Sequence, residues 1–134
     1  MLPRLTDTLQ FQTQALMLRS ERQRLIASNI ANADTPGYQA RDMNFAQALR
    51  EATGQSKAAQ LQVTQGGHIP VAGGARAEPN LLYVHPQQTH LDRNTVDMDR
   101  ERAAFADNSV KYEAALRFIN GSVKTMMEAI KGQA

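Results

Sequence analysis

The stretch MDRERAAFADNSVKYEAALRFINGSVKTMMEAI, residues 98–130, carries the strongest structural signal in the sequence. Ten positions in it are spaced alternately by four and three residues, and eight of them are apolar, which predicts a long amphipathic helix. Asp97 suits the N-cap of this helix, and Gly132 suits its C-terminal end. The positions are Met98, Arg102, Phe105, Ser109, Tyr112, Leu116, Ile119, Val123, Met126 and Ile130.

A second heptad pattern covers residues 2–33, with polar Arg19 and Gln23 in the middle of its seam. Neither helix can bury its apolar stripe alone, so the two are expected to pack as a coiled-coil pair, either parallel or antiparallel. A pair still leaves part of each stripe uncovered, which predicts further packing between molecules. The N-terminal packing positions are Leu9, Leu16, Ile26 and Ile30.

The first helix is expected to stop at residues 32–38, where Pro36 and Gly37 suit the centre of a type II turn. Asn44 then reads as an N-cap with Gln47 at N3, which predicts a short helix ending at Gly54.

The middle of the chain is rich in Gly, Gln, Ser, Ala and Pro and predicts a flexible insert. Only residues 61–63 and 81–84 look like short strands. The sequence therefore predicts a mainly α-helical chain in three parts. Residues 1–53 hold the first helix, turn and short helix, 54–95 the insert, and 96–134 the C-terminal helix.

Composition excludes several classes of protein. The 134 residues allow one domain, the absence of Cys excludes disulfides, and no apolar run is long enough to span a membrane. The N-terminus lacks the features of a cleavable secretory signal. The net charge of +2 lies in the first helix, where Arg19, Arg22 and Arg24 form a small cluster. With no broad basic surface or stacking aromatics, nucleic-acid binding is not expected.

No pattern of catalytic or metal-binding residues was found. His85, His90 and Asp92 could be imagined as a metal site, but they lack helical ligand spacing and a fourth ligand, so solvated histidines are the better interpretation, as for His68. Residues 97–101 resemble the start of a calcium loop without its glycine and closing glutamate. We therefore expect no enzyme activity, no cofactor and no metal.

Residues 28–38, SNIANADTPGY, closely resemble the N-terminal signature of bacterial flagellar rod and hook proteins. Residues 94–101, NTVDMDRE, are similar to the form found in proximal rod members of that family. The resemblance implies an axial structural protein whose terminal helices pack as coiled coils in the rod. It also implies export by the flagellar type III apparatus, without a cleavable signal peptide, to the periplasmic rod of the basal body.

The resemblance leads to a function hypothesis: a non-enzymatic proximal rod subunit that assembles helically and transmits torque for motility. Its expected partners are copies of itself, other rod proteins, the MS-ring end of the motor and the basal-body adaptor protein. A cytoplasmic coiled-coil adaptor or export chaperone is the alternative, and it would form a discrete dimer. The assembly motif is expected to comprise Asn29, Asn32, Thr35, Pro36, Gly37, Tyr38, Asn94, Val96, Asp97 and Met98.

Overall fold

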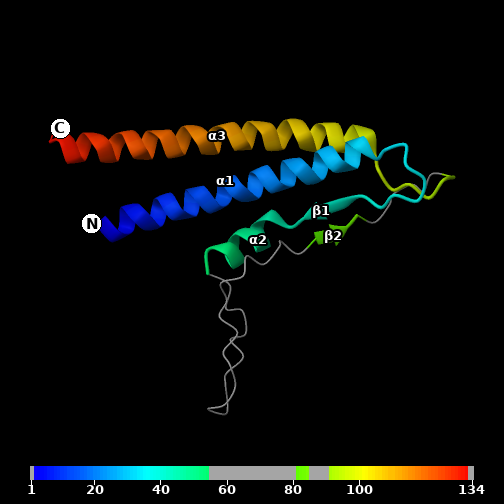
Figure 1. The fold of residues 1–134 in the computed structure, drawn as a ribbon, viewed down its shortest axis with the longest axis horizontal. Helices are drawn as coiled ribbons and strands as arrows, with labels where there is room; N and C mark the ends of the chain where they lie inside the picture. The colour runs from blue at the N-terminus through cyan, green and yellow to red at the C-terminus, as the bar shows by residue number, and fades with distance from the viewer. Residues whose placement is uncertain (1, 55–80, 85–90, 133–134) are drawn as a thin grey trace, which may run out of the picture.

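Two long helices dominate the computed structural model, which describes residues 2–54, 81–84 and 91–132. Helix α1 spans Leu2–Ala31 and helix α3 spans Met98–Lys131. They lie side by side and run in opposite directions, so that both termini are at the same end of the molecule (Figure 1). The predicted mainly helical fold and the pairing of the terminal helices are confirmed, and the pairing is antiparallel.

The predicted ends of α3 are confirmed by its cap residues. The Asp97 carboxylate accepts hydrogen bonds from the backbone N–H groups of Asp99 and Arg100 at 3.1 and 3.2 Å. These bonds satisfy donors that the first helical turn leaves without partners. At the other end, Gly132 adopts a left-handed conformation with φ of 67° and caps the helix.

The chain between the long helices adds a small second layer beside α1 (Figure 1). Strand β1 (Arg41–Met43) pairs antiparallel with β2 (Leu81–Tyr83), and Asp42 lies opposite Leu82. Helix α2 (Phe45–Ala52) begins as predicted at Asn44, whose side chain accepts from the Gln47 backbone N–H. The strand character of residues 81–84 is confirmed over β2. Strand β1 was not predicted, and residues 61–63 lie outside the described part of the chain.

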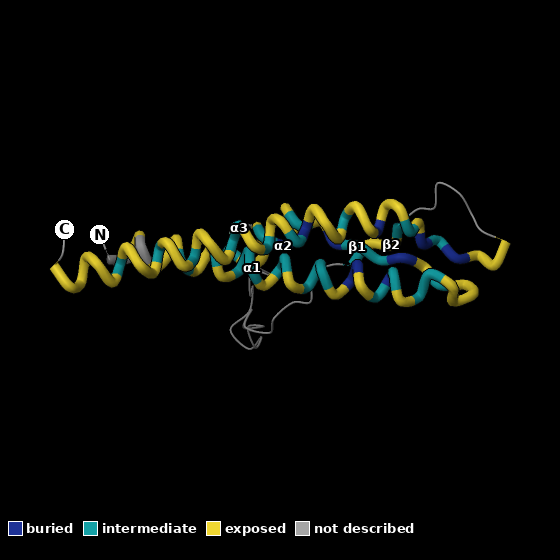
Figure 2. The backbone as a smooth tube through the Cα atoms, turned by 90° about the horizontal axis from the view of Figure 1, so that it is seen from above, coloured by how far each residue is buried: buried dark blue, intermediate teal, exposed yellow. Residues whose placement is uncertain are grey.

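Burial divides the molecule into two halves. Every described residue that is buried lies between residues 25 and 48 or between 94 and 108, at the end where the strands lie (Figure 2). We call residues 19–54, 81–84 and 91–111 the junction half, and residues 2–18 and 112–131 the open half. The open half is a bare pair of helices. The buried apolar residues are Leu25, Ile26, Ala40, Met43, Ala48 and Val96.

Neither long helix has the composition of a membrane span. In the described residues, no helical stretch combines enough length with enough apolar character to cross a bilayer.

Candidate functional site: the junction between the two sequence motifs

Asn94 ties the start of the C-terminal motif to the end of α1. Its side chain is 1% exposed, and its amide Nδ2 donates to the backbone carbonyls of Asn32, Ala33 and Thr35 at 2.9, 2.9 and 2.8 Å. Its Oδ1 accepts from the Val96 backbone N–H at 2.8 Å. These carbonyls belong to the turn that follows α1, outside the hydrogen-bonding pattern of the helix, and one distant side chain binds all three.

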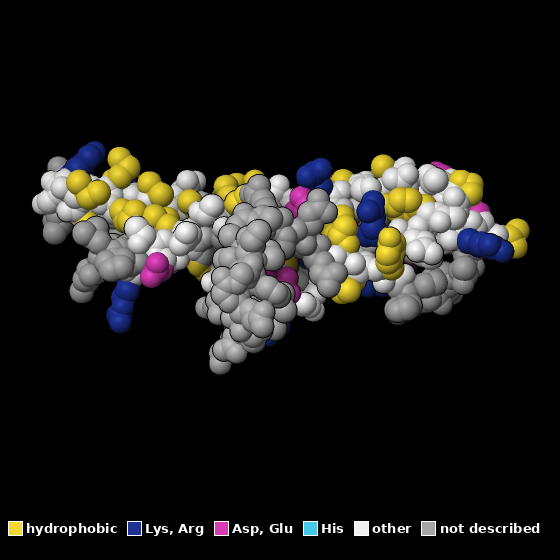
Figure 3. Space-filling model, turned by 60° about the horizontal axis from the view of Figure 1, so that its bottom comes forward, with side chains coloured by type: hydrophobic (Ala, Val, Ile, Leu, Met, Phe, Trp, Pro, Cys, Tyr) yellow, Lys and Arg dark blue, Asp and Glu magenta, His cyan; other side chains and the backbone are white. Residues whose placement is uncertain are grey.

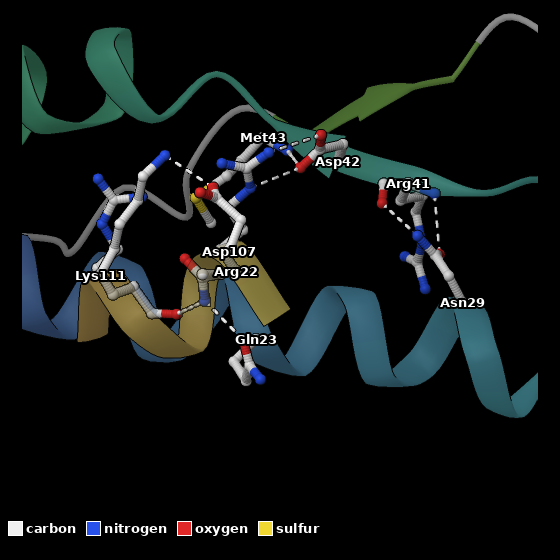
Figure 4. A network of polar contacts seen from close by, with 10 residues as sticks. Arg22, Gln23, Asn29, Arg41, Asp42, Met43, Asp107 and Lys111 are labelled. Carbon is white, nitrogen blue, oxygen red and sulfur yellow. Dashed lines mark hydrogen bonds and ion pairs between the residues drawn. The ribbon is translucent and has the colours of Figure 1, made fainter. Parts of the chain in front are cut away.

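Asn29 joins α1 to β1 in a similar way. It is also 1% exposed, and its amide donates to the Arg41 carbonyl at 2.8 Å, while its Oδ1 accepts from the Arg41 N–H at 3.1 Å. The Asn29 side chain thus satisfies both backbone groups of Arg41, as a neighbouring strand would. Figure 4 shows Asn29 facing Arg41 across the gap between the helix and the strand. The Tyr38 hydroxyl donates to the same Oδ1 at 3.2 Å.

The predicted turn lies between these two asparagines and is confirmed. The Tyr38 N–H donates to the Thr35 carbonyl at 3.2 Å across Pro36 and Gly37, and Gly37 has a φ of 73°. That conformation is favourable for glycine because no Cβ clashes with the backbone. Within the same segment, the Asn32 amide donates to the Ser28 carbonyl at 2.8 Å.

Backbone hydrogen bonds complete the connection between the two motifs. The Gly37 N–H donates to the Asp92 carbonyl at 2.8 Å, and the Thr95 N–H donates to the Tyr38 carbonyl at 3.0 Å. The Thr95 hydroxyl accepts from the Ala40 N–H at 2.8 Å. The two motifs, more than 50 residues apart in sequence, therefore form one structural unit, which we call the junction.

The predicted motif residues differ in exposure at this junction. Asn29, Asn94 and Val96 are buried, whereas Asn32, Tyr38 and Met98 are half-buried. The remaining four, Thr35, Pro36, Gly37 and Asp97, are exposed. Arg41, Asp42 and Thr95 also belong to this unit, although they are not among the predicted assembly residues. Thr95 lies within the motif of residues 94–101, and Arg41 and Asp42 follow residues 28–38 closely.

The basic cluster of α1 is partnered within the chain. Arg22 forms an ion pair with Asp42 of β1 at 3.3 Å (Figure 4). The Arg19 guanidinium lies 3.6 Å from the centre of the Phe45 ring of α2, a cation–π contact. Arg24 pairs with Glu21 at 3.2 Å on the exposed face. Arg22 and Arg24 therefore form ion pairs within the chain, and Arg19 contacts an aromatic ring.

Three ionisable groups of α1 and α3 have pKa values shifted from their ordinary values. Burial raises the pKa of the Glu101 carboxyl, while a hydrogen bond with Asn29 opposes this shift. Burial, followed by the charge of Arg22, lowers the pKa of Arg19. A hydrogen bond from Lys111 at 2.7 Å lowers the pKa of the exposed Asp107.

The predicted helix-packing residues also divide into two sets. Ile26 is buried, and Leu9, Leu16, Ile30, Tyr112, Ile119 and Met126 are half-buried. By contrast, Phe105, Leu116, Val123 and Ile130 remain exposed in the single chain. Hydrophobic side chains lie on the surface along the helices, including the end at which both termini lie (Figure 3). The packing of these exposed residues stays a prediction about neighbouring molecules.

The described residues contain no cluster of three or more His, Asp or Glu side chains that could hold a metal ion. His68, His85 and His90 lie outside the described ranges. Asp92, the third member of the imagined site, serves the junction, since its carboxylate accepts from the Asn94 N–H at 3.2 Å.

Comparison with known proteins places these features in one family. Residues 9–39 match the family model described as flagella basal body rod protein. The chain is 53% identical to the flagellar basal body rod protein FlgB of Proteus mirabilis, with 98% of both chains covered. It is 49% identical to FlgB of Salmonella typhimurium and 46% identical to FlgB of Escherichia coli, each over 98% of this chain and 98% or more of the relative. The chain therefore belongs to the FlgB family of flagellar basal body rod proteins.

Proposed function

We propose that this chain joins its neighbours in the rod through an apolar flank of α3 that α1 leaves uncovered. Family membership makes the chain a structural, non-enzymatic subunit of the flagellar basal body rod that assembles with other rod proteins. The observation that carries the proposal is the exposure of large apolar side chains along one side of a helix. The apolar flank consists of Phe105, Leu116, Val123, Met127 and Ile130, which are 37–83% exposed.

The flank has the properties of a surface that becomes covered on assembly. Its members repeat at helical spacing, and no charged side chain interrupts the spacing from Phe105 to Ile130. Full burial of a large apolar side chain contributes roughly 1.5–3 kcal/mol, and covering the exposed part of each flank residue contributes a fraction of that. Several such contacts per subunit give each interface substantial energy without a large core in the free chain.

Contacts between different surfaces of successive subunits generate an open helical assembly, as a rod requires. In the proposed mechanism, many long helices share the load, so torque from the motor passes towards the hook without concentrating on one contact. We place the chain in the proximal, periplasmic part of the rod. There it would also meet the MS-ring end of the motor and the basal-body adaptor protein, after delivery by the flagellar type III export apparatus. The resemblance of residues 94–101 to proximal rod proteins supports this placement.

The test is a charge placed on the flank. Val123→Asp should abolish rod assembly and motility, because an unpaired carboxylate would be buried at the interface. The free energy of unfolding of the isolated chain should change by less than about 1 kcal/mol, because Val123 is exposed there. Swimming assays, electron microscopy of basal bodies and thermal melting of the purified chain measure these effects.

Thr125→Asp is the matched control, since it adds the same charge at an exposed position of α3 that lies about 200° around the helix from Val123. It should leave motility unchanged. A motile Val123→Asp strain with normal basal bodies would reject the proposal, as would loss of motility in both strains.

A further inference from the structure

One heptad repeat on the side of α3 that faces α1 is unexpectedly polar. Glu101, Asn108, Ala115 and Ser122 repeat every seven residues along α3. Three of them meet polar partners on α1: Glu101 meets Asn29, Asn108 meets Gln23, and Ser122 meets Gln12. The more apolar repeat, which includes Leu116, Val123 and Ile130, lies one position along the helix and is exposed.

Asn108 is at the centre of this polar contact. It is 0% exposed, and its amide Nδ2 donates to the Arg19 carbonyl at 2.9 Å and to Gln23 Oε1 at 2.7 Å. Gln23 in turn donates from Nε2 to the Ser109 hydroxyl at 2.9 Å, and that hydroxyl donates to the Phe105 carbonyl at 2.7 Å. These four hydrogen bonds form a continuous chain between the helices.

Hydrophobicity alone would favour a different arrangement. A rotation of α3 about its own axis would bring Leu116 and Val123 against α1, where they would lose contact with water. The same rotation would break the Asn108 hydrogen bonds, and buried polar groups without partners are unfavourable. Asn108 Oδ1 already lacks a partner among the described residues, so this position is not optimised for stability alone.

We propose that the hydrogen-bonded pair Asn108–Gln23 sets the rotation of α3 about its axis and thereby keeps the apolar flank pointing away from α1. A single buried asparagine has a comparable orienting role in coiled coils, where it selects one arrangement at a cost in stability. The statement about rotation depends only on the contacts within the chain. Its value for assembly rests on the proposed function of the flank.

Because the chain has no cysteine, engineered cysteine pairs can report the rotation in the full-length protein. The pair Gln12→Cys and Ser122→Cys replaces side chains that are 3.2 Å apart. The pair Gln12→Cys and Val123→Cys reports the flank. With a short bis-maleimide at low protein concentration, the first pair should form the intramolecular crosslink severalfold faster than the second.

Adding Asn108→Leu should remove this preference, so that the two crosslinking rates become equal or reverse. Gln23→Leu removes the same pair from the other helix and should give the same redistribution. Thr125→Leu, a substitution at an exposed position of α3 away from the flank, should leave the preference unchanged. Circular dichroism should show that all three variants keep their helices.

The proposal is overturned if the parent chain shows no preference, or if both variants retain it. Loss of helix in both variants would also overturn it, because the pair would then determine folding instead of orientation. The proposed function is judged separately by motility of the Val123→Asp strain. A motile Val123→Asp strain would reject the flank as an interface, whatever the crosslinking rates are.

Discussion

The junction half and the open half are built from the same two helices and stabilised by different means. In the junction half, buried asparagines connect α1, β1 and the segment before α3, so that the polypeptide is held by specific hydrogen bonds. In the open half, no described side chain is buried, and apolar residues remain at the surface. The difference shows that the chain fixes its own geometry at one end and offers packing surface to neighbours at the other.

The largest effect on stability is expected in the junction. Asn94→Ala removes three hydrogen bonds to carbonyls of the turn that follows α1 and the bond from the Val96 N–H. Because buried polar groups left without partners each have a substantial cost, the free energy of unfolding should fall by about 3 kcal/mol or more. Thermal or urea unfolding followed by circular dichroism measures it.

Asn120→Ala in the open half is the control for that substitution, because Asn120 is exposed. It should change stability by no more than about 0.5 kcal/mol. Equal destabilisation by the two substitutions would mean that the proposed division into halves does not describe how the chain is stabilised.

One substitution, glycine to alanine, should have opposite effects in the two halves. Gly37 in the junction has a φ of 73°, and alanine there is strained, so stability should fall by about 1 kcal/mol. Gly121 lies within α3, and a Cβ added there meets no atom within 4 Å. Because alanine is the better helix former, Gly121→Ala should raise the free energy of unfolding by about 1 kcal/mol. Melting temperatures that shift in the same direction would contradict this prediction.

A smaller effect is expected from the buried carboxyl of Glu101. Since burial raises its pKa above the ordinary value of 4.5, the folded chain binds this proton more tightly than the unfolded chain. The stability that protonation provides is complete below about pH 4.5 and is lost as pH rises through the folded-state pKa. At pH 7, Glu101→Gln should therefore raise the free energy of unfolding by less than about 1 kcal/mol.

Melting curves across pH test this prediction. The difference between Glu101→Gln and the parent chain should shrink as the pH falls to the unfolded-state value. Asn120→Ala, which removes no ionisable group, should show the same difference from the parent chain at every pH. A stabilisation of equal size at low and neutral pH would show that removal of the charge is not its cause.

The helices, their caps and the turn after the first helix could be predicted from the sequence because they depend on local chemistry. Asp97 and Asn44 cap helices, and Gly37 takes a positive φ, for reasons contained in a few neighbouring residues. Strand β1 could not be predicted, since three residues carry no alternation and its pairing partner begins at Leu81. The two hydrogen bonds between the Asn29 side chain and the Arg41 backbone could not be predicted either, because they depend on how β1 lies against α1.

The rotation of α3 about its axis also could not be predicted from the spacing of its apolar residues. The spacing identifies Leu116, Val123 and Ile130 as residues that seek apolar surroundings. It does not state whether α1 or another molecule provides them. The contact between Asn108 and Gln23, residues 85 positions apart, becomes visible only when the two helices are placed together.

The hydrogen bonds between Asn94 and the turn after α1 have a consequence for the folding rate. They come from a residue 59–62 positions later in the chain than the carbonyls it binds. A long loop must therefore close before these bonds can form, and loop closure has an entropic cost. Helical proteins whose contacts are local in sequence fold fastest. In this chain, by contrast, contacts that hold the junction together join residues far apart in sequence. Its folding is expected to be slower than that of a helical hairpin whose first helix is capped by neighbouring residues.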